Sequence, residues 1–353
     1  MNNDYRKTYV EIKLNNIKEN VSKIVDKYNN YKYYFGVVKA DCYGHSGIET
    51  IQAIIDGGCN YLAVALLEEA LEIRKKIKDI PIICLGYIST DYIDICAENN
   101  ITITVNSVEY AEELIKKNIS SIKVHLKVDT GMHRLGISDQ SDFNYVYNLL
   151  KNKVNIEGLY THIYNAQDEN DTINQFDKFK KITSSINLKD IPIIHISASE
   201  TIVLHDKMEF VNGCRLGIII YGFTKDKALN LKSTFTLHSE IIQIHNLESG
   251  DNLGYGVYKV LRNTRVAVVQ IGYADGIIRE NTGRSVFINN RKYKIMGNIC
   301  MDMLFIEIDE KVKLYDDVII LKDIDHIEEV ATHLNTIPYE IICSISKRVP
   351  RIY

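Results

Sequence analysis

Residues 61–86 read YLAVALLEEALEIRKKIKDIPIICLG, and this stretch contains the unit on which the predicted fold depends. It begins with a short apolar run, Tyr61–Ala65, and ends with a second one, Ile82–Gly86. Between them, Leu67–Arg74 places apolar residues at the i, i+3, i+4 and i+7 spacing of an amphipathic helix. A strand, a helix and a second strand in this order predict a parallel β-α-β unit, since parallel strands need a crossover connection.

The same alternation extends in both directions, from about residue 33 to about residue 225. Eight repeats of the unit are what a closed (β/α)₈ barrel of the TIM type requires. An open doubly wound sheet is the alternative that the pattern leaves open. The other apolar runs are Phe35–Lys39, Ile101–Val105, Lys123–Val128, Ile156–Tyr160, Ile193–Ile196 and a last one near Val211–Ile220.

The pattern changes after about residue 232 to the two-residue alternation of β-strands separated by turns. We therefore expect two domains: a barrel at 1–231 and a mostly antiparallel β domain at 232–353. The opening segment Thr8–Leu14 also alternates like a strand and fits either domain. Strands are predicted at Ser239–His245, Val266–Ile271, Arg284–Asn289 and Asp317–Leu321, and helices at about 326–335 and 338–345.

Composition excludes several classes of protein. The 353 residues include 42 Lys and Arg against 46 Asp and Glu, a net charge of −4, which does not suit a nucleic-acid partner. The longest apolar runs are far shorter than the roughly 20 residues that span a membrane, and the first residues lack the apolar core of a secretory signal. Seven scattered cysteines without a CxxC pair indicate reduced thiols. We expect a cytoplasmic protein without a membrane partner.

A lysine stands at the end of the first apolar run of the barrel, where functional groups gather in this fold. A lysine that is buried at a strand end has a lowered pKa, which favours Schiff-base chemistry, so Lys39 is a candidate, although a single lysine is a weak signal. The turn Tyr43-Gly44-His45 that follows adds polar groups at the same mouth.

A second polar group lies on the strand predicted at Lys123–Val128. His125, Lys127 and Asp129 alternate and therefore share one face, and Arg134 follows them. One interpretation is an ion pair inside the barrel. The other is that Arg134 contacts an anionic ligand or a cofactor oxygen. A charged lysine would repel that arginine, so Lys127 fits better if it is neutral or modified.

Other candidates have ordinary structural explanations when each is taken alone. Histidines such as His162 are more often core residues than ligands, and no HExxH or Cys/His spacing supports a metal site. Arg215 lies between Gly213 and Gly217, where free N–H groups suit a phosphate on the late strands. Tyr255 stands between two glycines and is expected to be exposed in a turn.

Together these segments resemble the alanine racemase family of pyridoxal-phosphate enzymes. The matching segments occur in the family's order from residue 37 to residue 353, so the resemblance covers nearly the whole chain. It implies a barrel followed by a β domain, and a homodimer in which each active site is completed by the partner's β domain. The segments are VVKADCYGHS, HLKVDTGMHRLGI, THIYNAQD, HISASE, CRLGIIIYG, GYG, IGYADG, GNICMDM and PYEIICSISKRVPRIY.

The resemblance also implies a role for each matching residue. Lys39 resembles the lysine that holds pyridoxal 5′-phosphate as a Schiff base and acts as one acid/base, and Tyr255 resembles the opposing acid/base from the other subunit. Lys127 matches a lysine that the family often carries as a carbamate. The remaining matches are Arg215 at the pyridine nitrogen, His162 beside the ring, Arg134 at the phenolic oxygen and the substrate carboxylate, Tyr43, Ser199, Gly217, Ile218 and Tyr339 at the phosphate, Met301 at the substrate carboxylate and Tyr273 at the entrance.

Racemisation gives these residue types a chemical reason. A proton must leave one face of the α-carbon and return to the other, which two bases on opposite faces achieve. A free tyrosine titrates near ~10, so Tyr255 needs a positive neighbour, and we expect Arg215 to act as that neighbour through His162. An arginine at the ring nitrogen leaves that nitrogen largely unprotonated, since guanidinium does not readily give up a proton.

Departures from the family pattern bear on the substrate. Ala198 stands where asparagine is common, THIYNAQD differs from the usual segment, and Met303 replaces a common glutamine. A serine or broad-specificity racemase is therefore the alternative, although Tyr339 favours alanine. A non-catalytic pyridoxal-phosphate carrier would lack the β domain, and a related decarboxylase would need other C-terminal residues. A Schiff-base aldolase that uses Lys39 would have no use for the GYG and CMD segments. The prediction is an alanine racemase that supplies D-alanine for peptidoglycan.

Overall fold

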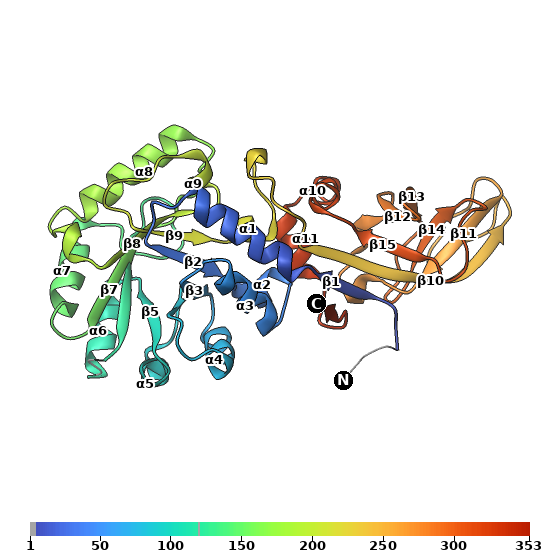
Figure 1. Ribbon diagram of the computed structural model, residues 1–353. Helices are drawn as coiled ribbons and strands as arrows, with labels where there is room; N and C mark the ends of the chain where they lie inside the picture. Colours follow the sequence, from blue (N-terminus) through green and yellow to red (C-terminus); the bar gives the residue numbers. More distant parts are fainter. Residues whose placement is uncertain (1–4, 119–120) are drawn as a thin grey trace. The chain divides into compact units, whose positions relative to one another are not determined.

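The computed structural model describes residues 5–118 and 121–353, so the first four residues of the domain predicted at 1–231 lie outside the described residues. The chain forms two compact units, which Figure 1 shows in the colours of the sequence. Of the described residues, 17–42 and 47–231 form the barrel unit, and 5–16, 43–46 and 232–353 form the sheet unit.

Eight parallel strands close into a barrel in the barrel unit, which confirms the predicted fold and excludes the open sheet. The ring closes where the last strand pairs with the first, with Phe35 opposite Arg215. The strands are β2 (Tyr33–Val37), β3 (Tyr61–Val64), β4 (Ile82–Cys84), β5 (Ile101–Val105), β6 (Lys123–Lys127), β7 (Asn155–Tyr160), β8 (Ile193–Ala198) and β9 (Gly213–Leu216).

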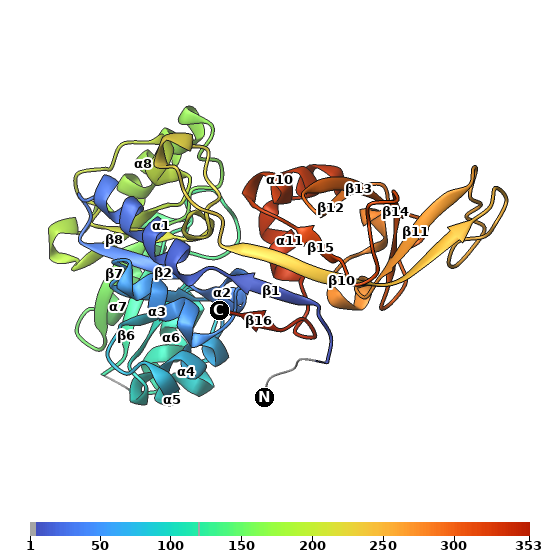
Figure 2. The ribbon, with the colours of Figure 1, turned by 45° about the vertical axis from the view of Figure 1, so that its right-hand side comes forward.

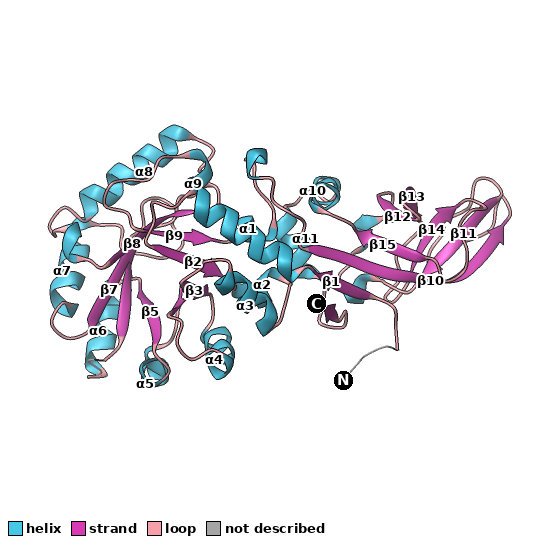
Figure 3. Cartoon of the chain, viewed as in Figure 1, coloured by secondary structure: helices cyan, strands magenta, loops and turns pink. Residues whose placement is uncertain are grey.

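Helices follow the barrel strands and cover the outside of the ring (Figure 3). In α6, α7 and α8 the first turn is closed by a side-chain cap, since an Asp or Ser oxygen accepts N–H groups that lack a helical partner. Ser107, Asp139 and Asp168 do this for α6, α7 and α8. The helices are α1 (Leu14–Lys27), α3 (Ile48–Asp56), α4 (Leu67–Lys76), α5 (Ile93–Glu98), α6 (Val108–Lys116), α7 (Gln140–Leu150), α8 (Glu169–Ile182) and α9 (Thr201–Leu204).

The sheet unit is built on one eight-stranded, mostly antiparallel sheet. Its strand order is β11-β14-β13-β12-β15-β10-β1-β16, and β10 also pairs with β11. Among the described strands of this sheet, β1 and β16 are the pair that runs parallel, and β1 lies between β10 and β16 (Figure 2). The strands are β1 (Tyr9–Ile12), β10 (Phe235–Leu247), β11 (Thr264–Val269), β12 (Ser285–Ile288), β13 (Arg291–Met296), β14 (Leu304–Ile308), β15 (Asp317–Leu321) and β16 (Arg351–Ile352).

Most predicted elements of the sheet unit occur where the alternation places them, and the two helices are α10 (Ile324–His333) and α11 (Pro338–Ser344). The sequence does not predict β13, because Arg291–Met296 reads RKYKIM and its exposed face is strongly charged. A tight hairpin creates it: Asn289 and Asn290 both have positive φ, 50° and 61°, as a two-residue turn between twisted strands requires. No described helix is long and apolar enough to cross a membrane.

Candidate active site

Basic side chains gather at the carboxyl ends of the barrel strands. Lys39 follows β2, Lys127 ends β6, and Arg215 lies in β9. Their common neighbour is His162, just after β7. Burial first, and then the charges of Arg215, Lys127, Arg134 and Lys39, lower the pKa of His162 to about 3. The structure therefore brings five predicted site residues into one cluster.

Arg215 is the most firmly held member of this cluster. Nη1 donates to His195 Nδ1 at 2.8 Å and to the His195 carbonyl at 2.6 Å. Nη2 donates to the carbonyls of Thr161 at 2.8 Å and Ile196 at 3.1 Å, and to His162 Nδ1 at 3.1 Å. Burial lowers the pKa of Arg215 to about 10, and none of these partners is a carboxylate.

The bond from Arg215 decides which nitrogen of His162 carries the proton. Arginine has only donors, so His162 Nδ1 must accept. Since the low pKa keeps His162 neutral, its proton lies on Nε2. His162 thus presents an N–H donor on the side away from Arg215.

Lys127 is buried in a positive environment. Burial first, followed by the charges of Arg215 and Arg134, lowers its pKa to about 7, against a smaller opposing effect of Asp129. Its Nζ donates to the Val128 carbonyl at 3.1 Å. Near neutral pH the Lys127 amine is therefore uncharged in a large fraction of the molecules, which agrees with the prediction that Lys127 is neutral or modified.

Asp129 organises the loop that leads from β6 to Arg134. Its Oδ1 accepts the backbone N–H groups of Gly131 at 2.9 Å and His133 at 3.1 Å. Burial raises its pKa, but these two bonds outweigh that effect and lower it. Asp129 therefore holds the backbone of the loop, whereas Arg134 itself is exposed.

The segment after Lys39 has an unusual backbone. Ala40, Asp41, Cys42 and Tyr43 all have φ between 52° and 55°, so the chain makes a left-handed turn without glycine. Each such residue costs about 1–2 kcal/mol. Glu69 holds the start of the turn, since its Oε1 accepts the Ala40 N–H at 2.6 Å. The sequence predicts a tight turn only at 43–45 and gives no sign of this strain.

Two predicted phosphate-binding residues of the barrel unit lie together. Ser199 Oγ accepts the backbone N–H of Gly217 at 3.0 Å. Ile218 follows at once and begins a short 3₁₀ helix, Ile218–Tyr221. The segments that follow β8 and β9 are therefore joined by the bond between Gly217 and Ser199.

The two tyrosines predicted at the phosphate lie together in the sheet unit. The rings of Tyr43 and Tyr339 are 6.1 Å apart, and burial raises the pKa of Tyr43. The next residue, Gly44, must be glycine, because a Cβ there would lie 2.2 Å from the Ile342 carbonyl oxygen. The Gly44 carbonyl in turn accepts from Arg351 Nε at 2.9 Å.

Three predicted residues of the sheet unit lie on adjoining loops and are exposed. Tyr255, Tyr273 and Met301 have exposed fractions of 74%, 42% and 52%. Asn298 Nδ2 donates to the Tyr255 carbonyl at 2.8 Å, and the Tyr273 N–H donates to the Cys300 carbonyl at 3.1 Å. The loops of Tyr255 and Tyr273 are thus both bonded to the segment that ends in Met301.

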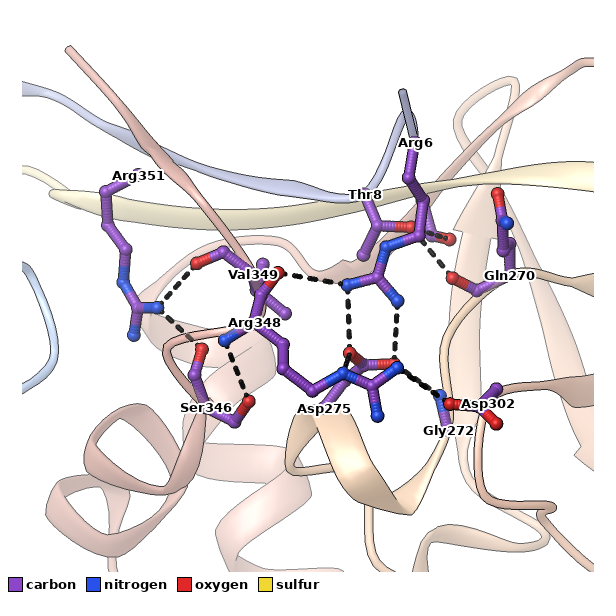
Figure 4. Close-up of polar contacts among 11 residues, drawn as sticks. Arg6, Thr8, Gln270, Gly272, Asp275, Asp302, Ser346, Arg348, Val349 and Arg351 are labelled. Atoms are coloured by element: carbon purple, nitrogen blue, oxygen red, sulfur yellow. Dashed lines mark hydrogen bonds and ion pairs between the residues drawn. The ribbon is translucent and has the colours of Figure 1, made fainter. Parts of the chain in front are cut away.

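A buried carboxylate that the sequence analysis does not single out, Asp275, holds the loops of Tyr273 and Met301 (Figure 4). Asp275 accepts two bonds from Arg6, at 3.1 and 2.9 Å, and lies 3.7 Å from Arg348 Nε. Arg348 also donates to Asp302, next to Met301, at 2.7 Å. Arg6 was not predicted, because an arginine near the start of a chain carries no local signal of a partner 269 positions away.

The chain is similar to known proteins over its whole length. The model for the N-terminal domain of alanine racemase matches residues 12–225, and that for the C-terminal domain matches 234–353. "Alanine racemase 1" of Bacillus subtilis is 34% identical, with 99% of this chain and 93% of that protein covered. The alanine racemase of Staphylococcus saprophyticus is also 34% identical, with 99% and 95% covered.

Solved structures give the same result. The crystal structure of alanine racemase from E. faecalis has a TM-score of 0.93 at 30% identity and covers 99% of both chains. That of alanine racemase from Bacillus anthracis with bound L-Ala-P has a TM-score of 0.91 at 31% identity, with 99% of this chain and 95% of that chain covered.

Proposed function

The chain belongs to the alanine racemase family, and from this premise we propose that it interconverts L-alanine and D-alanine with pyridoxal 5′-phosphate as cofactor. The observation that carries the proposal is the cluster around His162, in which four basic side chains lower the pKa of one histidine. Such a cluster suits an anionic, phosphorylated cofactor. The donors in the barrel unit therefore fit the group.

Each donor matches one part of that cofactor. We assign the Schiff base to Lys39, the ring nitrogen to Arg215 and the phenolic oxygen to Arg134. The phosphate is assigned to Tyr43, Ser199, Gly217, Ile218 and Tyr339. When bound, the cofactor supplies an electron sink that makes the substrate's α-proton acidic.

The protein's own part of the reaction is proton transfer. Lys39 takes or returns the α-proton on one face, and Tyr255 does so on the other. Tyrosine must be helped to ionise, and His162 is suited to this because its Nε2–H is free of the bond to Arg215. Met301 and Arg134 are assigned to the substrate carboxylate, and Tyr273 to the entrance.

We assign Tyr255, Tyr273 and Met301 to the active site of a second copy. Their exposure supports this, since large apolar side chains gathered on adjoining loops are typical of surfaces that meet another protein. A homodimer with shared active sites is therefore part of the proposal. So is a cytoplasmic role that supplies D-alanine for peptidoglycan.

Lys127 is proposed as a carbamate. Its amine attacks CO₂ through the nitrogen lone pair and releases a proton to water, which needs the uncharged form that a pKa of about 7 provides. The product is an anion, so it replaces a repulsive neighbour of Arg134 by an attractive one.

A chiral assay in deuterated water with added pyridoxal phosphate tests the function. L-Alanine should give D-alanine with an α-deuteron, faster than L-serine gives D-serine. The variants Lys39→Ala and Tyr255→Phe should both lose racemisation. Faster turnover of serine would move the function to serine racemisation, and an unchanged rate in Tyr255→Phe would exclude the two-base assignment.

A further inference from the structure

A row of hydrogen-bonded side chains crosses the interior of the barrel and ends on Arg215. Glu157 Oε2 lies 3.2 Å from His125 Nε2. His125 Nδ1 lies 2.8 Å from His195 Nε2, and His195 Nδ1 lies 2.8 Å from Arg215 Nη1. Both histidines are fully buried, whereas the Glu157 side chain, near the amino end of β7, is 16% exposed.

The surrounding residues hold both imidazole rings in place. A Cβ at position 158 would lie 2.5 Å from His125 Cε1, so Gly158 leaves the room that this ring needs. The His195 ring lies between Phe35 and Tyr160, with centroid distances of 4.5 and 4.6 Å. The geometry of the row is therefore set by the barrel and not by the hydrogen bonds alone.

The two ends of the row fix the direction of every bond in it. Arg215 can only donate, so His195 Nδ1 accepts and the proton of His195 lies on Nε2. His195 Nε2–H then donates to His125 Nδ1, which places the proton of His125 on Nε2. That N–H donates to Glu157, which as a carboxylate can only accept.

Neither histidine can take up a second proton without placing two donors face to face. The pKa values of both histidines fit this arrangement. Burial first, and also the charge of Arg215, lowers the pKa of His125 and that of His195. Glu157 must be ionised for the same reason, because a proton on its Oε2 would face the N–H of His125. Burial works to raise its pKa, but bonds from His125 and Tyr61 outweigh this and lower it to about 2.

This directionality excludes a proton relay along the row, since Arg215 neither accepts a proton nor readily releases one. What the row does supply is a negative charge. Among the residues that the structure describes, no hydrogen-bond partner of Arg215 is a carboxylate, and the oriented N–H groups of two neutral imidazoles connect it to an ionised one.

We propose that Glu157 and His125 are positioning residues: they supply, through His195, the counter-charge and the fixed acceptor that keep Arg215 charged and oriented in the cationic cluster. The link to catalysis rests on the proposed function, in which Arg215 faces the cofactor ring. The direction of the bonds is a property of the barrel alone.

The first experiment uses the cofactor-free protein labelled with ¹⁵N-histidine. Long-range ¹H–¹⁵N spectra, assigned with the variants His125→Gln and His195→Gln, should show both residues as neutral Nε2–H tautomers between about pH 6 and 9. A proton on Nδ1 of either ring, or an imidazolium in that range, would overturn the proposal, whether or not the protein is a racemase.

The second experiment uses Glu157→Gln to separate the charge from the hydrogen bond. Oε2 accepts from Tyr61, Thr102 and His125, and an amide oxygen can replace it, while the NH₂ group takes the side facing Lys123. The matched control is Glu72→Gln, which removes an exposed carboxylate paired with Lys75 on α4.

The readout is the thermal midpoint with and without pyridoxal phosphate. Glu157→Gln leaves the cationic cluster less compensated, so its cofactor-free midpoint should be lower and its gain on adding the cofactor larger than in the wild type. Glu72→Gln should behave like the wild type. An equal or smaller gain in Glu157→Gln would show a merely structural role and overturn the proposal. If pyridoxal phosphate does not raise the thermal midpoint even of the wild type, the proposed function fails. The histidine spectra would then still test the direction of the hydrogen bonds in the row.

Discussion

At the scale of single residues, Lys127 shows how the barrel changes the chemistry of one side chain. Its pKa falls from 10.5 to about 7, because of burial first and then Arg215 and Arg134. Between these two values the unfolded chain binds a proton that the folded protein does not, so this group makes stability rise with pH across that window. Below about pH 7 the folded protein bears the full cost of a buried ammonium.

Lys127→Met should therefore stabilise the cofactor-free protein at neutral pH in CO₂-free buffer. The gain should be largest at or below about pH 7 and should shrink as pH rises toward 10.5, where the wild-type amine is neutral in both states. Thermal midpoints against pH measure it. Lys75→Met, at an exposed position on α4, should show no such trend. A gain independent of pH would mean better packing and not the loss of a charge.

The same residue should carry the proposed modification. Protein equilibrated with ¹³C-bicarbonate should show one slowly exchanging carbamate resonance that is absent from Lys127→Met. Acidification should remove it, because protonation of the amine withdraws the uncharged form that binds CO₂. Persistence of the signal in the variant would assign it to another amine.

At the scale of elements, the left-handed turn after Lys39 predicts that replacement of alanine by glycine does not destabilise the protein there, in contrast to the same replacement in a helix. Ala40→Gly should leave stability unchanged or raise it by up to about 1 kcal/mol, since glycine adopts positive φ without strain. Ala53→Gly, inside α3, should cost about 1 kcal/mol or more. Urea unfolding of both variants compares them. A loss at Ala40 as large as at Ala53 would contradict the left-handed turn.

The Asp275 cluster in Figure 4 predicts how the exposed loops are held. Asp275→Asn leaves Arg6 without its buried bidentate partner and should cost about 3 kcal/mol. Arg348→Met should cost less, because Arg348 is half exposed and lies 3.7 Å away. Urea unfolding gives both values, and the reverse order would mean that Arg348 is the main partner.

How much the sequence predicts depends on how local each signal is. The barrel follows from eight repeated units, and the positions of Lys39 and Arg215 from short motifs at strand ends. The strained turn at Ala40 has no glycine to announce it. The row from Glu157 to Arg215 leaves almost no sign in the sequence, because it joins β-strands that meet only when the barrel closes. Glu157 did carry one sign: it is a lone carboxylate within an apolar run.

At the scale of the whole molecule, shared active sites make a prediction about mixtures of inactive chains. If Tyr255 serves the partner's Lys39, a dimer of one Lys39→Ala chain and one Tyr255→Phe chain contains one site with both defects and one with neither. Each variant alone should be inactive. An equal mixture, unfolded and refolded together, forms mixed dimers as about half of its population and should regain about one quarter of wild-type activity. Mixing two separately refolded variants without exchange is the control. No recovery in the co-refolded sample, with mixed dimers verified by differently tagged chains, would mean that each chain's Tyr255 serves its own barrel.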